Sequence, residues 1–323
     1  MDGALLPRFA NWIVQVGSFR SMTDWTALAR RGGLSCHDLV GWIMWDQRAI
    51  TGYEALGVPN GMGWLVAWRL ASLGDTTSAT AAAATYSINP SVIATVMNAY
   101  QDKTDTESIL AVRDAAVGPG LAEIAPGLAD ELGGFAKALW LGVDSVHFGA
   151  RPMFAAHRSR PRSVKIDSVL SAWLAVNCLR ELRGDNHWAL CASEDLDGVE
   201  VGLLHSALID LDDYGSEEWI ARSRGNDDEA IAAGWARLEA KGLASNGALT
   251  DEGRRFRFDL EARTDALTAP AWMAVGKEAT TGFCELVEPH HNTFVARINA
   301  TAGPRWMPAV RQDAASRSRR LTQ

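Results

Sequence analysis

The sequence predicts an all-α protein, in which a helical ligand-binding body is followed by a winged helix-turn-helix module with a minimal β wing. Most periodic stretches place apolar residues at helical spacing, and alternating runs of strand length are scarce. Residues 195–265 show the order helix, helix, helix, wing, helix. We therefore expect a ligand-binding domain at 1–194, a winged-helix-like domain at 195–268, and a C-terminal helix with a flexible basic tail at 269–323.

The N-terminal half carries helix signals at regular intervals. Trp42 and Trp45 lie on one helix face, Trp64 and Trp68 lie on the face of another, and the Gly-rich stretch Gly57–Gly63 is the turn between the two helices. Two further helices have start signals, Asn89-Pro90 and the capping box Thr104–Glu107, and the second is expected to end before a loop at Gly118–Gly120. A long helix is expected from 164 to 191, broken or ended by Gly184.

The C-terminal module has its own helix caps and turn signals. Helices are predicted at Asp197–Ile209, Ser216–Arg222 and Asp227–Lys241, the third capped by Asn226. Ser245-Asn246-Gly247 predicts a tight hairpin turn, and Thr250 caps a long final helix. Arg305–Arg320 is expected to be a flexible basic tail.

Composition excludes several classes of protein. Hydrophobic residues make up 47% and charged residues 22%, which suits a globular chain with a sizeable core. No apolar run could cross a bilayer, and Met1–Ala10 lacks the pattern of a signal peptide, so we expect a cytoplasmic protein with no membrane partner. The four cysteines form no CxxC pair and are expected to be free thiols. Signatures of nucleotide-binding loops, nucleophile elbows and HExxH metalloproteases are missing from the sequence.

Four segments carry a family resemblance. They are Trp235–Leu267 (WARLEAKGLASNGALTDEGRRFRFDLEARTDAL), Leu179–Leu190 (LRELRGDNHWAL), Val201–Leu208 (VGLLHSAL) and Arg151–Pro161 (RPMFAAHRSRP). The first resembles the recognition helix, wing and exit helix of MarR-type regulators. Together they resemble a large actinobacterial family with a helical N-terminal half and a C-terminal helix-turn-helix. The resemblance implies an all-helical body joined to a winged-helix module, and it carries no activity with it.

This chain departs from the resembled family at two positions. The family tends to have an acidic residue where this chain has Leu34, three positions before His37, and a histidine where it has Leu182. If those family residues bind a metal, part of the set is missing here.

The negative charge of the C-terminal module argues against sequence-specific DNA binding by its recognition helix. Between 195 and 265 there are about 17 acidic and 8 basic side chains, and the recognition helix begins Asn226-Asp-Asp-Glu229. A reading helix places its first residues against bases and phosphates, which carboxylates would repel. We expect sequence-specific DNA to be an unlikely partner.

Acid–base chemistry is expected at three residues. Asp185 and His187 follow Gly184, where a break in the helix could aim both into a cavity, and an aspartate beside a histidine raises its basicity. His37, at the start of the helix carrying Trp42 and Trp45, would be a second acid–base or ligand residue. The alternative for each histidine is a structural role.

Two cofactor alternatives stay open, because the sequence leaves the cofactor unknown. A distant His147 with His187 and Cys191 in an HxxxC pattern resembles the attachment site of histidine-ligated haem aromatic hydroxylases. Asp185, His187 and His37 could instead form a mixed nitrogen and oxygen metal site. His205 is expected to be a packed core residue.

Thirteen tryptophans against four tyrosines suggest a pocket for a flat ligand. We expect Trp42, Trp45, Trp64 and Trp68 to converge near His37. Glu181 and Arg183 would form an ion pair or clamp a ligand carboxylate.

The leading functional hypothesis is an enzyme of actinobacterial specialised metabolism, such as antibiotic biosynthesis, that acts on a flat aromatic or hydrophobic small molecule. A haem-dependent aromatic hydroxylase or oxygenase and a ligand-responsive winged-helix regulator or drug-binding protein are the alternatives. A homodimer is expected in each case.

Overall fold

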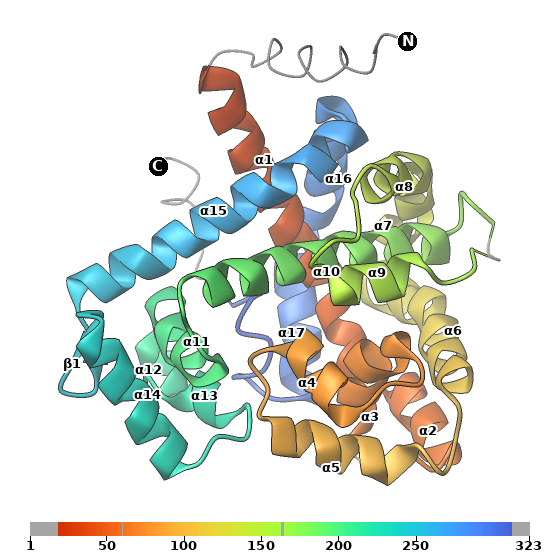
Figure 1. The fold of residues 1–323 in the computed structure, drawn as a ribbon. Helices are drawn as coiled ribbons and strands as arrows, with labels where there is room; N and C mark the ends of the chain where they lie inside the picture. Colours follow the sequence, from red (N-terminus) through yellow and green to blue (C-terminus); the bar gives the residue numbers. More distant parts are fainter. Residues whose placement is uncertain (1–18, 60, 163–164, 312–323) are drawn as a thin grey trace, which may run out of the picture.

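The computed structural model describes residues 19–59, 61–162 and 165–311. It confirms the predicted all-α class, because β-structure in these residues is confined to one small hairpin (Figure 1). None of the described helices is long and apolar enough to cross a membrane. The expectation for Met1–Ala10 lies outside the described residues.

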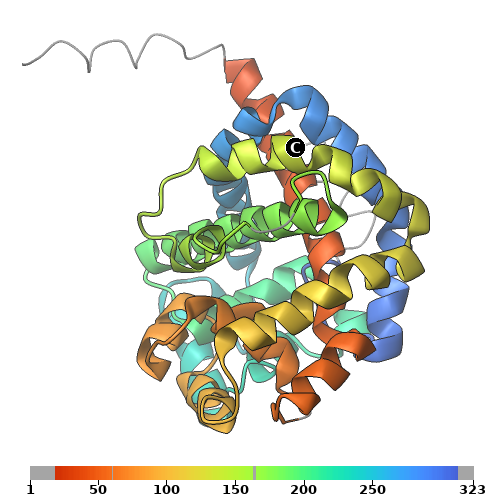
Figure 2. The same ribbon diagram turned by 90° about the vertical axis from the view of Figure 1, so that its right-hand side faces the viewer.

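The body begins with a long helix that runs through the molecule. Figure 2 shows this helix, α1, extending from one end of the fold to the other beside the blue C-terminal helices. Its bounds and those of the next elements are α1 (Phe19–Gly41), the 3-10 helix η2 (Trp42–Trp45), α2 (Gln47–Ala55), α3 (Gly63–Leu65), the π-helix η3 (Val66–Leu70), the 3-10 helix η4 (Ala71–Leu73), α4 (Ser78–Thr85) and α5 (Pro90–Tyr100). The predicted Asn89 cap is confirmed, since its side chain accepts a hydrogen bond from the Ser91 N–H.

Helices α6 to α10 complete the body around α1. Their bounds are α6 (Thr106–Ile124), α7 (Pro126–Leu132), the 3-10 helix η5 (Gly133–Phe135), α8 (Ala136–Asp144), α9 (Pro152–Arg158) and α10 (Val169–Ser193). The loop expected at Gly118–Gly120 is wrong, because α6 continues through it, and the cap is Asp105. Gly120 is needed there, since a Cβ would lie 2.4 Å from the ring of the buried Trp42.

The winged-helix module follows α10. It consists of α11 (Gly198–Leu204), the 3-10 helix η6 (His205–Leu208), α12 (Leu211–Tyr214), α13 (Trp219–Arg222), α14 (Asp228–Ala240), β1 (Ala244–Ser245), β2 (Ala248–Leu249) and the first half of α15 (Asp251–Val275). The predicted hairpin is confirmed: Asn246 and Gly247 both have positive φ between paired strands. Thr250 caps α15 as predicted, but Asp227 rather than Asn226 caps α14.

Helix α15 links the module to the body. It runs from the β hairpin to the far side of the molecule, where it packs on α1, α8 and α10 (Figure 1). The expected domain boundary at 268/269 falls inside this helix. Close packing with α1 depends on Gly32, where a Cβ would lie 2.5 Å from the Trp272 ring.

The C-terminal segment returns to the core. Helix α16 (Lys277–Val287), the 3-10 helix η7 (Glu288–His290) and α17 (His291–Thr301) lie along α1. Residues 303–311 then pass between body and module, with Val310 fully buried. The flexible tail expected from Arg305 is therefore wrong for the residues up to 311, and the remainder lies outside the described part.

Candidate functional site

A cavity of about 140 Å³ lies where the body meets the winged-helix module. The body contributes side chains from α1, η3 and α10. The module contributes side chains from α11, η6, α13 and α15, and residues 307–309 form a further part of the wall. A molecule bound here would touch both parts of the chain.

Helix α10 supplies one continuous wall. Arg180, Arg183, Gly184, His187 and Trp188 are spaced so that they share one helix face, and all of them line the cavity. The break expected at Gly184 is wrong, because α10 is continuous through this residue. A Cβ at Gly184 would meet only Glu181 Oε2, at 3.9 Å. Gly184 thus leaves open space in the wall.

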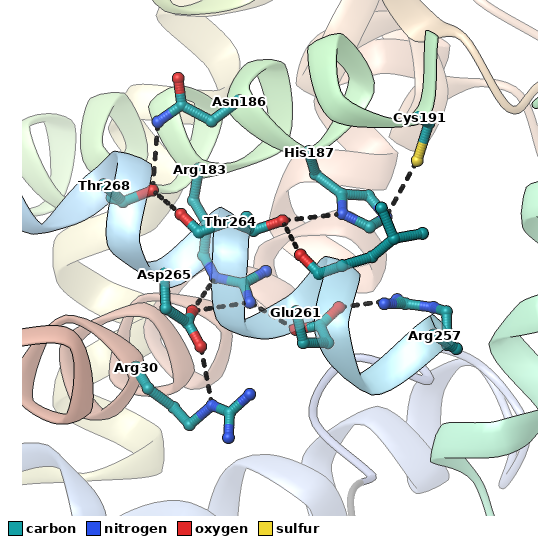
Figure 3. A network of polar contacts seen from close by, with 11 residues as sticks. Arg30, Arg183, Asn186, His187, Cys191, Arg257, Glu261, Thr264, Asp265 and Thr268 are labelled. Carbon is teal, nitrogen blue, oxygen red and sulfur yellow. Dashed lines mark hydrogen bonds and ion pairs between the residues drawn. The ribbon is translucent and has the colours of Figure 1, made fainter. Parts of the chain in front are cut away.

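Two carboxylates of α15 hold the arginines on one side of the cavity (Figure 3). Glu261 accepts from Arg183 Nη2 at 2.5 Å and pairs with Arg257 Nη2 at 2.6 Å. Asp265 accepts from Arg30 Nε at 2.7 Å and from Arg183 Nη2 at 3.0 Å. Burial raises the pKa of Glu261, but Arg183 and Arg257 outweigh it and hold that pKa well below its usual range.

A third carboxylate is shared in the same way on the other side. Glu181 accepts from Arg69 Nη1 at 2.8 Å and from Arg180 Nη1 at 2.6 Å. Arg224, which also lines the cavity, has no carboxylate within ion-pair distance among the residues the structure describes. Burial lowers the pKa of both Arg180 and Arg224 to about 10, so both remain cationic at neutral pH.

His187 is a neutral imidazole with an assigned tautomer. The Thr264 hydroxyl donates to the Leu260 carbonyl at 2.6 Å, so its oxygen accepts from His187 Nδ1 at 3.1 Å. The lone pair of His187 Nε2 then faces Cys191 Sγ at 3.7 Å. Burial, with Arg257 nearby, lowers the pKa of His187 to about 3, and burial raises that of Cys191 to about 12. The pair is therefore uncharged and has no thiolate nucleophile.

Two other histidines line the cavity. Burial lowers the pKa of His37 and of His205 well below the usual value, so both are neutral. His37 Nδ1 and His205 Nε2 have no hydrogen-bond partner within the described part of the chain. His37 lies near the end of α1 rather than at a helix start, and His205 faces the cavity rather than a closed core, so both expectations are corrected.

The expected Asp185–His187 pair does not form. The two residues are two positions apart on a continuous helix and point to different faces. Asp185 Oδ2 instead accepts the Phe154 N–H at 2.8 Å, at the first turn of α9. Burial raises the pKa of Asp185 to about 7. Asp185 lies outside the cavity lining and supports α9.

Trp42 and Trp45 do not line the cavity beside His37, so this part of the expected tryptophan pocket is wrong. Trp42 is fully buried against α6, and Trp45 lines a separate hollow of about 300 Å³ with Trp306. Trp64 and Trp68 belong to α3 and η3, and their side chains lie outside the described part. The flat wall of the cavity is Trp188, whose ring stacks on Tyr86 at 5.3 Å.

The residues for a haem or metal site do not converge. His147 is exposed beside Arg151, whereas His187 and Cys191 contact each other inside the fold. Among the described residues, no cluster of three His, Cys, Asp or Glu side chains could hold a metal ion. Leu34 lines the cavity at the position where the resembled family has an acid.

Glu181 and Arg183 do not pair with each other. Glu181 pairs with Arg69 and Arg180, and Arg183 pairs with Glu261 and Asp265. Sequence reasoning missed Arg69, Arg180, Arg224 and Arg257, which surround the cavity. The spacing of Arg180, Arg183 and His187 on one helix face was the signal that could have found the α10 wall. Nothing in the sequence placed Arg69 or Arg224 beside it.

The outer surface of the module is acidic. Asp228 and Glu229 are exposed at the start of α14. Basic side chains near the module surface are in ion pairs with its carboxylates or with Glu194: Arg222, Arg237, Lys241, Arg254, Arg255 and Arg263.

The fold and cavity define a helix-turn-helix protein with an internal ligand-sized site. Residues 29–301 match the model of a family described as the helix-turn-helix family, and the chain belongs to that family. Neither curated proteins nor solved structures give a significant match. The MarR-type and actinobacterial parts of the resemblance stay predictions.

Proposed function

We propose that this protein is a ligand-responsive helix-turn-helix protein whose module forms one wall of a small-molecule site. The observation that carries the proposal is the cavity lined by both α10 of the body and α11, η6 and α15 of the module. A ligand with contacts on both parts stabilises one arrangement of the two over others, and this differential affinity is the basis of ligand response.

The cavity walls indicate the size and character of the ligand. Its volume of about 140 Å³ is close to the ~150 Å³ of an apolar protein cavity that holds benzene. Leu34, Val201, Ile220 and Met307 provide apolar surface, and Trp188 provides a flat wall. These features favour a small ligand with an apolar, planar body.

Sequence-specific DNA is not the expected partner of α14. Its exposed first turn is acidic, and the basic side chains near the module surface are held by carboxylates. Phosphate contacts need cations that can reach the DNA backbone. The proposal therefore places the response in the module's position rather than in base reading by this helix.

An enzyme of specialised metabolism is the second candidate. The observation that favours it is the pair of neutral imidazoles, His37 and His205, that line the same cavity. Efficient acid–base catalysis needs a pKa near the working pH, and burial holds both pKa values far below it. Ligand binding therefore ranks above catalysis.

Filling the cavity tests the proposed function. In Gly184→Leu, the new side chain would occupy the open space beside Glu181, whereas Gly127→Leu adds the same group on the exposed face of α7. A panel of charged and neutral molecules of up to about ten heavy atoms is screened by thermal shift. We expect some to stabilise the wild type and Gly127→Leu but not Gly184→Leu.

The panel also separates the two candidates. Mass spectrometry of each stabilising molecule after incubation shows whether it is returned unchanged, as binding predicts, or converted, as catalysis predicts. If no molecule stabilises the wild type, or if Gly184→Leu binds as well as Gly127→Leu, the proposed function is wrong. The homodimer stays a prediction, which light scattering of the purified chain tests.

A further inference from the structure

Arginines outnumber carboxylates among the described residues that line the cavity. Five of the described arginines line it: Arg69, Arg180, Arg183, Arg224 and Arg257. Three described carboxylates form ion pairs with arginines of this set, Glu181, Glu261 and Asp265, and each is shared between two guanidinium groups. None of these three carboxylates lies within ion-pair distance of Arg224.

Arg257 has hydrogen-bond donors left over. Its residue is 2% exposed, and its Nη2 pairs with Glu261 Oε1 at 2.6 Å. Its Nε and Nη1 are buried and have no acceptor among the residues described. Leaving a buried charged donor unsatisfied is costly, so a site that holds such donors is suited to a ligand that brings acceptors.

Arg224, on the module side of the cavity, also favours a negatively charged ligand. It lines the cavity from the turn that follows α13, without a carboxylate within ion-pair distance in the described part of the chain. Burial and the neighbouring Arg69 both lower its pKa, because the cation is held in a poorly hydrated place beside a like charge. An anion between Arg224 and Arg69 would remove this penalty.

The remaining polar groups do not favour a cationic ligand. Glu261 is the single carboxylate among the described lining residues, and Arg183 and Arg257 already occupy it. Trp188 Nε1 is a buried donor with no acceptor in the described residues. Among the described lining residues, guanidinium donors therefore outnumber carboxylate acceptors.

We infer that the cavity binds a small organic acid, in which one carboxylate meets Arg224 and Arg257 and an apolar body lies against Trp188 and Ile220. This inference rests on the proposed function and names its ligand class. A body of benzene size fits the volume of about 140 Å³, and guanidinium groups match carboxylates in charge and planar geometry.

Calorimetric titration with matched probes tests the ligand charge. Benzoate is compared with benzamide, which has the same shape without the charge, and with inorganic phosphate, which has charge without the apolar body. We expect benzoate to bind at least about tenfold more tightly than either probe, a difference of about 1.4 kcal/mol.

Two arginine variants with neighbouring controls test the contacts. Arg224→Gln, in the turn after α13, is compared with Arg222→Gln at the end of that helix, and Arg257→Gln with Arg255→Gln on α15. Arg222 and Arg255 are exposed and lie outside the cavity lining. We expect benzoate affinity to fall at least about tenfold in the cavity variants and less than about twofold in the controls.

Melting temperatures show whether a variant binds more weakly because it has lost stability. Arg224→Gln should melt at the same temperature as the wild type or higher, since it removes a partly buried charge that has no ion-pair partner in the described residues. Weaker benzoate binding in a variant that is equally stable therefore reports a ligand contact.

Each outcome decides between the proposals. Equal affinity for benzoate and benzamide, or unchanged benzoate binding in Arg224→Gln, overturns the organic-acid inference and leaves the proposed function standing. Phosphate binding without benzoate binding also overturns this ligand class. If neither charged nor neutral organic molecules bind, the proposed function fails together with the inference.

Discussion

The two faces of the winged-helix module carry opposite charge. The outer face presents Asp228 and Glu229 at the start of α14, in the position where a DNA-reading helix meets its target. The inner face, toward α10, presents Arg224 and Arg257 to the cavity between module and body. In the described part of the module, the arginine that has no ion-pair partner, Arg224, faces this cavity rather than the outer surface.

This difference in charge means that the helix-turn-helix fold is present here without the surface that DNA reading, its commonest use, requires. A helix-turn-helix supplies the scaffold, whereas the charges on its two faces set what it can bind. Surface cations such as Arg222 are held by Glu218 and Asp228, while Arg257 keeps unpaired donors in the interior.

The largest expected effect is on the inner face. Glu261→Gln removes the carboxylate shared by Arg183 and Arg257, which leaves two buried guanidinium groups close together. We expect a loss of about 3–5 kcal/mol in the free energy of unfolding, measured by urea denaturation. Glu252→Gln, which breaks the exposed pair with Arg255, should cost less than about 1 kcal/mol. Similar losses in the two variants would contradict the buried network.

Asp185 is a buried carboxyl group near the cavity that is kept neutral rather than paired with a cation of the described residues, and its titration can be tested. Burial and the nearby Glu181 raise its pKa to about 7, against the opposing effect of the Phe154 N–H and of Arg69. Because the folded-state pKa exceeds the unfolded value of about 3.9, the stability from protonation is complete below pH 3.9 and is lost as pH rises through 7.

Asp185→Asn should therefore stabilise the protein at high pH. The amide oxygen can still accept the Phe154 N–H, so the contact with α9 is kept. We expect a gain of up to about 4 kcal/mol at pH 8 that disappears near pH 4, measured by urea denaturation across pH. A constant difference between variant and wild type at every pH would show that Asp185 does not titrate this way.

Much of the fold was predictable from local signals. Asn89-Pro90, Asn246-Gly247 and Thr250 each marked an element boundary correctly, because capping and turn geometry depend on neighbouring residues. The loop predicted at Gly118–Gly120 was wrong, since the packing of Trp42 against Gly120 keeps this stretch helical. Tertiary contacts overrode the local preference there.

The candidate site was predictable only in part. His187, His37 and Arg183 were singled out from the sequence, and the structure places all three in the cavity lining. The Asp185–His187 pair was wrong because it required a helix break that α10 does not have. Arg69 and Arg224 come from distant segments, and no spacing along the chain relates them to α10.

The outer face gives the third prediction. We expect no sequence-specific DNA binding by the wild type at nanomolar protein and physiological salt. Replacing Asp228 and Glu229 together by lysine should raise non-specific DNA affinity about tenfold or more at low salt, and the gain should shrink as salt rises. Fluorescence anisotropy measures both.

A body variant controls for net charge in this experiment. Asp130→Lys with Glu131→Lys changes the net charge equally on the exposed face of α7, far from α14 in sequence. Equal gains in both double variants would show that overall charge, not the position of α14, limits DNA binding. Specific binding by the wild type would contradict the contrast between the two faces.

The smallest expected effect concerns the space in the inner wall. Alanine is a better helix former than glycine by about 1 kcal/mol, and the Gly184 position has room for a Cβ. Gly184→Ala should therefore raise the free energy of unfolding by up to about 1 kcal/mol. Gly32→Ala, also inside a helix, should lower it by about 1–3 kcal/mol, because its Cβ would overlap the Trp272 ring. Urea denaturation of both variants measures the contrast. A destabilised Gly184→Ala would mean that this glycine is needed for packing and does not mark free space at the cavity.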